Sequence, residues 1–149
     1  MGGAEALTPN ALLGGFEWFI QAKLWQNITA DLSLDYVRGQ ETGGDRNNLS
    51  FMPPLRLQAA FKYITDKYWM GPRIRAVSTQ NRVAENEDPT KGYLIFGINA
   101  GYHIQPNISL TFRVDNLLNT SYSDHLSRIE ERNNPMPARN FNAMLRWDF

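Results

Sequence analysis

The last ten residues, 140–149, alternate strictly between apolar and polar positions. The apolar positions end at the final residue: Phe141, Ala143, Leu145, Trp147 and Phe149. A period of two predicts an extended strand with one apolar and one polar face. A soluble protein normally covers or blunts such an edge, so the bare aromatic end favours a closing strand whose outer face meets lipid. An ordinary strand at the end of the chain is the alternative.

The same alternation recurs in six earlier segments, so we predict an all-β protein with seven strands. The earlier segments are 12–25, 28–38, 55–65, 68–80, 93–104 and 108–116. Proline has no N–H to donate to a sheet ladder, so Pro72 predicts a bulge or a break in the fourth strand.

Within the cores of the seven segments, charged side chains keep to one parity. The set is Glu17, Lys23, Asp31, Asp35, Arg56, Lys62, Arg73, Arg75, Arg113, Asp115, Arg146 and Asp148. A charge facing lipid at mid-bilayer costs roughly 2–4 kcal/mol, so a membrane barrel must exclude it. A soluble sandwich or barrel would also keep charges out of its core, so this sorting alone does not decide between them.

The connections between the segments alternate in length. Short connections lie at 26–27, 66–67 and 105–107, and long ones at 39–53, 81–91 and 117–139. Outer-membrane barrels have short periplasmic turns and long extracellular loops, and here every short turn falls on the side of the chain end. Aromatic residues of the apolar parity gather on that side, where an interfacial girdle belongs: Tyr63, Tyr68, Tyr102, Trp147 and Phe149. The pattern predicts an antiparallel up-and-down transmembrane β-barrel.

Composition excludes several other classes. The 149 residues carry 15 basic and 15 acidic side chains and no cysteine, so neither a basic nucleic-acid face nor a thiolate metal site is indicated. No apolar run is long enough for a membrane-spanning helix. Residues 1–10 lack the features of a signal peptide, so we expect the chain to be part of a longer exported protein.

No catalytic motif is present, and we predict that the protein is not an enzyme. The chain has no G-x-S-x-G, no HExxH and no glycine-rich phosphate loop. Ser123, Asp124 and His125 are neighbours in sequence, which is not the geometry of a catalytic triad.

Four segments carry a resemblance to a known family. Residues 51–57 (FMPPLRL), 114–122 (VDNLLNTSY), 124–128 (DHLSR) and 135–141 (PMPARNF) resemble the late strands and loops of TonB-dependent outer-membrane receptors, although glycine is commoner there than Ala138. The resemblance covers about 11–149. It implies a barrel of about 22 strands of which this chain is about the last seven, with the plug domain and signal peptide absent.

The resemblance also implies a function and partners. Such receptors actively transport scarce nutrients across the bacterial outer membrane, with a ferric siderophore or another metal chelate foremost. The TonB complex would act through the missing N-terminal part. The barrel-assembly machinery would read the terminal strand through Phe141, Leu145, Trp147 and Phe149, and outer-membrane lipid would surround the barrel. No cofactor and no nucleic-acid partner is expected.

Ligand contacts are expected from the long loops and the polar face. The candidates are His125, Asp124, Arg128, Arg132, Arg56 and Arg113. His125, with Asp124 and Met136, has donor types that suit a soft or borderline metal, but loop packing is the alternative and no metal site is assigned.

Arginines on the polar face could attract an anionic chelate. The set is Arg56, Arg73, Arg75, Arg113 and Arg146. Their alternative role is a network with Asp31, Asp35, Asp115 and Asp148, or contact with a plug. In the second long loop, Glu85, Glu87 and Asp88 are expected to be solvated.

Two other architectures remain open. A soluble lipocalin-like barrel would turn the apolar parity inward around a small ligand. A small porin-like barrel would be complete in itself, for example by forming an oligomer, although an odd number of strands is unusual for bacterial barrels.

Overall fold

A computed structural model describes residues 10–42, 47–85, 87–129, 132–133 and 135–149. One antiparallel sheet contains seven strands in the order β1-β2-β3-β4-β5-β6-β9, and a separate pair contains β7 and β8. The bounds are β1 (Ala11–Trp25), β2 (Ile28–Glu41), β3 (Arg56–Ile64), β4 (Tyr68–Val77), β5 (Tyr93–Gln105), β6 (Ile108–Asp115), β7 (Arg128–Ile129), β8 (Arg132–Asn133) and β9 (Asn140–Trp147).

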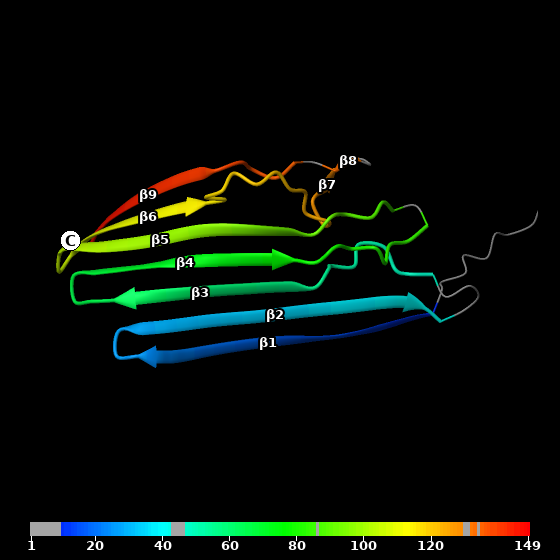
Figure 1. Cartoon of the computed structure of the whole chain (residues 1–149), viewed down its shortest axis with the longest axis horizontal. Helices are drawn as coiled ribbons and strands as arrows, with labels where there is room; N and C mark the ends of the chain where they lie inside the picture. The colour runs from blue at the N-terminus through cyan, green and yellow to red at the C-terminus, as the bar shows by residue number, and fades with distance from the viewer. Residues whose placement is uncertain (1–9, 43–46, 86, 130–131, 134) are drawn as a thin grey trace, which may run out of the picture.

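The large sheet is an up-and-down meander. Figure 1 shows its strands side by side in chain order, with the short turns and the C-terminus at one end and the long connections at the other. The predicted all-β class and the seven strands are therefore confirmed. Among the described residues, no helix is long and apolar enough to cross a membrane.

The strand ends differ from the prediction where neighbouring strands decide them. β2 continues to Glu41 because its last residues pair with the start of β1, as in Ala11 with Glu41. β4 ends at Val77, and beyond it Gln80 makes only an isolated bridge to Thr90. The short pair β7–β8 lies inside the predicted 117–139 loop and was not expected, because two-residue strands leave no periodic signal.

The predicted interruption at Pro72 lies between β3 and β4. Pairing runs from Arg56–Val77 to Ala60–Arg73, stops, and resumes in the same register at Tyr63–Met70. On the other side, Pro72 pairs with Ile98 of β5. Gly71 lies so close to the Phe61 carbonyl oxygen that a β-carbon there would collide with it. The interruption is a break without a register shift.

The two faces of the sheet have opposite character. The apolar parity is largely exposed, with Trp18 at 63% and Leu145 at 66%. It forms what we call the outer face, and the polar parity forms the inner face. In the part of the chain that the structure describes, the apolar side chains do not enclose a cavity, which contradicts the lipocalin-like alternative.

Buried side chains gather at the long-loop end of the inner face. Val77 and Tyr93 are the buried apolar residues of the described part, and Gln80, Thr90, Asn116 and His125 are the buried polar ones. Asn116 directly follows β6 and has a positive φ of 51°, which asparagine tolerates better than most residues. Its side chain accepts the Thr120 N–H and donates to the Thr120 carbonyl, both at 2.8 Å, which fixes the first turn of the β6–β9 loop.

Candidate functional site

The inner face contains a hollow of about 410 Å³ lined by polar side chains from β2, β3, β4 and β6. Asp31 and Ser33 line one side, and Arg73, Arg75 and Arg113 line the other. We call Arg56, Arg73, Arg75 and Arg113 the arginine wall. The period of two places all four on the inner face, where their charges avoid the outer apolar surface.

Asp115, at the end of β6, binds two members of the arginine wall. Arg113 Nε donates to its Oδ2 at 2.7 Å, and Arg73 Nη2 donates to its Oδ1. Arg73 comes from β4, so its guanidinium must cross β5 to reach β6. It crosses over Gly97, where a β-carbon would lie 3.2 Å from Arg73 Nη2 and 2.8 Å from the Val114 carbonyl oxygen. The absence of a side chain at Gly97 leaves room for this bridge.

Asp124, in the β6–β9 loop, binds the other two members. Its Oδ2 lies 2.7 Å from Arg75 Nη2 and accepts the Tyr93 hydroxyl at 3.0 Å. Its Oδ1 lies 3.8 Å from Arg56 Nη2 and accepts the Leu126 N–H at 3.0 Å. The side chain is 12% exposed. One carboxylate therefore joins the loop to β3, β4 and β5.

Four groups lower the pKa of the Asp124 carboxyl. Burial alone would raise the pKa, because it disfavours the charged form. The Leu126 N–H, the Tyr93 hydroxyl and the guanidinium groups of Arg56 and Arg75 outweigh burial and hold the pKa below its usual 3.8. Asp124 is thus a permanent anion at neutral pH.

His125 points into the loops rather than toward the hollow. It is 1% exposed, with Nδ1 3.0 Å from Thr90 Oγ1 and Nε2 3.2 Å from Glu87 Oε1. In the described part of the chain, no group of three or more His, Cys, Asp or Glu side chains is placed to hold a metal ion. His125 is therefore enclosed by residues of the β4–β5 loop in this structure.

The candidates separate into three groups. Arg56 pairs with Asp124, and Arg113 pairs with Asp115, both at the inner face. His125 is buried away from it, and the side chains of Arg128 and Arg132 lie outside the described part of the structure. Of the alternative arginine–aspartate network, the structure contains the contacts of Asp115 with Arg73 and Arg113. It also contains the contact of Asp148 with Arg146, at the opposite end of the sheet.

Sequence reasoning missed some residues of this site. Glu87 was expected to be solvated, but its side chain is 4% exposed against His125, so that expectation was wrong. The rings of Tyr93 and Tyr122 pack at a tilt, with centroids 4.4 Å apart, beside Asp124. No sequence signal could have found these contacts, because their partners come from different loops.

Comparison with known proteins gives one family. The family profile described as "TonB dependent receptor-like, beta-barrel" matches residues 5–117. No curated protein sequence matches the chain.

Several solved structures share the fold. The copper transporter OprC superposes with a TM-score of 0.86 at 27% identity, over 93% of this chain and 24% of that one. The FrpB iron transporter from Neisseria meningitidis gives 0.75 at 19%, over 93% and 23%. The ferripyoverdine receptor of the outer membrane of Pseudomonas aeruginosa gives 0.70 at 19%, over 93% and 20%. The chain thus spans between a fifth and a quarter of the length of these three proteins.

Proposed function

The chain belongs to the family of TonB-dependent receptor β-barrels, and on that premise we propose that it forms part of the wall of an outer-membrane active transporter for a scarce nutrient. The observation that carries the proposal is the match of the barrel profile over residues 5–117, on a seven-stranded meander with an apolar outer face and a charged inner face. We propose transport, and no enzymatic activity.

An anionic metal chelate, such as a ferric siderophore, is the proposed substrate class. The arginine wall presents four guanidinium groups to two carboxylates, Asp115 and Asp124. Guanidinium pairs well with carboxylate, phosphate and similar oxyanions. Relatives named for ferripyoverdine and for iron transport support this class.

Copper is the second candidate, because one similar structure is a copper transporter. A bare copper ion would need histidine, thiolate or thioether ligands. Among the described residues, His125 is enclosed by Thr90 and Glu87, and no metal-holding cluster is present. The wall therefore favours a chelate with negative charge over a free cation.

The proposal includes membrane and protein partners. Backbone groups on an open sheet edge are costly in lipid, and β1 and β9 each have one unpaired edge within the described sheet. We propose that further strands of a longer barrel cover both edges and that a plug lies against the inner face. A small porin-like oligomer is the alternative arrangement.

Energy would come from the TonB complex. Phe141, Leu145, Trp147 and Phe149 would form the signal for the barrel-assembly machinery, in a barrel surrounded by outer-membrane lipid.

Uptake in cells tests this function. A strain lacking the gene should lose growth on at least one ferric chelate as sole iron source, and loss of TonB should give the same defect. Arg113→Glu should raise the half-saturating chelate concentration at least about tenfold, the effect of losing one charge-assisted contact. Arg146→Glu, on the same face far from Asp115, is the control, with uptake normalised to the amount of receptor in the membrane. Unchanged uptake of every chelate, with a defect under copper limitation, would replace the chelate by copper.

A further inference from the structure

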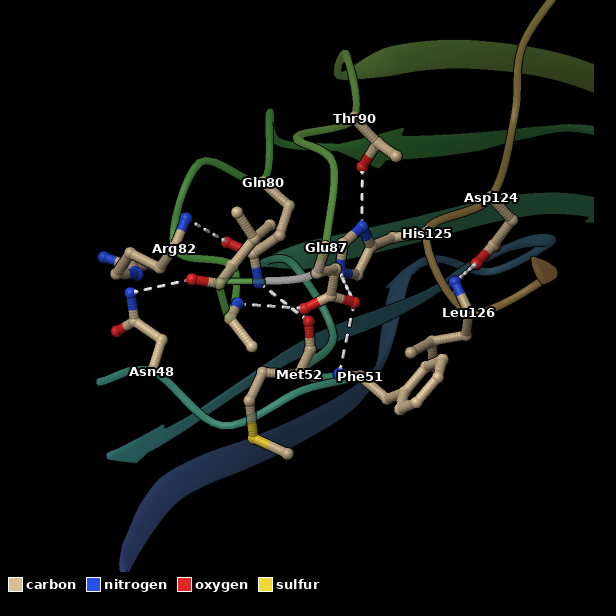
Figure 2. A network of polar contacts seen from close by, with 12 residues as sticks. Asn48, Phe51, Met52, Gln80, Arg82, Glu87, Thr90, Asp124, His125 and Leu126 are labelled. Atoms are coloured by element: carbon tan, nitrogen blue, oxygen red, sulfur yellow. Dashed lines mark hydrogen bonds and ion pairs between the residues drawn. The ribbon is translucent and has the colours of Figure 1, made fainter. Parts of the chain in front are cut away.

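The Glu87 carboxylate lies where the three long loops meet. Its Oε1 accepts the Phe51 N–H of the β2–β3 loop at 3.2 Å and lies 3.2 Å from His125 Nε2 of the β6–β9 loop. Its Oε2 accepts the Ala84 N–H of its own β4–β5 loop at 3.2 Å. Figure 2 shows the carboxylate between the His125 ring and the Phe51 backbone.

Other bonds join the same loops in pairs. Gln80 Nε2 donates to the Met52 carbonyl at 2.7 Å, and Asn48 Nδ2 donates to the Val83 carbonyl at 3.3 Å. Both connect the β2–β3 loop to the β4–β5 loop. His125 Nδ1, on the other side, lies 3.0 Å from Thr90 Oγ1, which joins the β4–β5 loop to the β6–β9 loop (Figure 2).

The side chains that form this junction, Glu87 and His125, are buried. The Glu87 side chain is almost fully enclosed, and the His125 side chain fully so. A buried carboxylate that loses one of its donors keeps its desolvation cost without compensation, which is strongly unfavourable. Separating any one loop from the other two would leave the Glu87 carboxylate without at least one of its partners. Moving the three loops together breaks none of these bonds.

We propose that the Glu87–His125 pair couples the three long loops, so that they open and close as one body. A ligand that contacts one loop would then be sensed by all three. Asp124, beside His125, ties the same body to the arginine wall, so its movement also shifts the groups that face the hollow. The coupling rests on the contacts and holds whichever nutrient is transported.

Hydrogen exchange on the native protein in lipid tests the coupling. Glu87→Ala should raise amide exchange at least about tenfold at Leu49, in the β2–β3 loop, and at Ser127, in the β6–β9 loop, although neither amide bonds to Glu87. Glu85→Ala is the matched control, because Glu85 is exposed in the same loop and should change neither amide. Faster exchange confined to 78–92 would overturn the proposal.

A second variant separates coupling from local damage. His125→Ala should also raise exchange at Leu49, because it removes the junction without touching the β2–β3 loop. The double variant should exchange no faster than Glu87→Ala alone, since both changes break one unit. Additive effects of the two substitutions would mean that the loops open independently. If Glu87→Ala does not assemble, Glu87→Gln, which keeps the shape without the charge, carries the same comparison.

Discussion

The carboxylate of Asp124 lies 2.7 Å from the guanidinium of Arg75, although 49 positions of chain separate them. Arg75 belongs to β4, whereas Asp124 follows β6, so the loop after β6 folds back across the end of β5. Tyr93, the first residue of β5, donates to the same carboxylate. The long-loop end is therefore closed by a charged contact over the inner face.

Asp124→Asn should weaken the docking of this loop. The amide keeps the size of the side chain but loses the charge that Arg75 and Arg56 bind. The opening free energy at Leu126, measured by hydrogen exchange, should fall by about 1–3 kcal/mol. Asp148→Asn is the control, because its pair with Arg146 is exposed and such pairs contribute little. Equal effects of both changes would contradict a special role for Asp124.

The contact between Asp124 and Arg75 should keep the β6–β9 loop docked down to a defined acidic pH. The pKa of Asp124 is lowered on docking, so protons bind more tightly to the undocked state. Docking stability is then fully present above the ordinary pKa of 3.8 and is lost only as pH falls through the lower, docked value. Protease sensitivity of residues 117–127 should stay constant from neutral pH to about 4 and rise below it. A rise between pH 5 and 7 would show that another group controls the loop.

Gly71→Ala should destabilise the sheet at the break beside Pro72. The new β-carbon would collide with the Phe61 carbonyl oxygen, so the backbone of β3 or β4 must move. A cost of about 1–3 kcal/mol is expected for such overpacking, seen as a lower temperature for loss of the compact band on unboiled gels. Gly14→Ala is the matched control in β1, where a β-carbon has no atom within 4 Å. The prediction fails if both variants lose the compact band at the same temperature.

Two adjacent positions of β2 distinguish the faces. Leu32 lies on the outer face, and Ser33 lines the hollow on the inner face. Leu32→Lys should lower the free energy of unfolding in lipid by up to about 2–4 kcal/mol, because a charge would face hydrocarbon. Ser33→Lys should cost far less, since its charge would lie near Asp31. Urea titration in lipid vesicles measures the free energy of unfolding of both variants. A larger loss for Ser33→Lys than for Leu32→Lys would mean that the two faces are assigned wrongly.

Periodicity predicted the strands because a sheet with one apolar and one polar face constrains the residue at every position. Phe112 and Arg113 show this: neighbours in sequence, they fall on opposite faces as alternation requires. The ends of β2 and β4 were less predictable, because pairing with β1 and the Gln80–Thr90 bridge decide them.

The site was predictable only where it lies on strands. The placement of Arg56 and Arg113 on the inner face follows from parity, and Arg113 lines the hollow there. Asp124 was singled out from its loop, but nothing in the sequence indicated that it would meet Arg75 or Tyr93. Glu87 and His125 were harder still, since their burial depends on three loops meeting and on no local pattern.

Gly97 links three positions that lie far apart in sequence. Arg73 reaches Asp115 only because the intervening strand offers no side chain at this point. Among homologues, positions 73, 97 and 115 should therefore be inherited as a set. A lineage that replaces the glycine should also have lost the arginine or the aspartate, and a lineage that keeps both charges should keep the glycine.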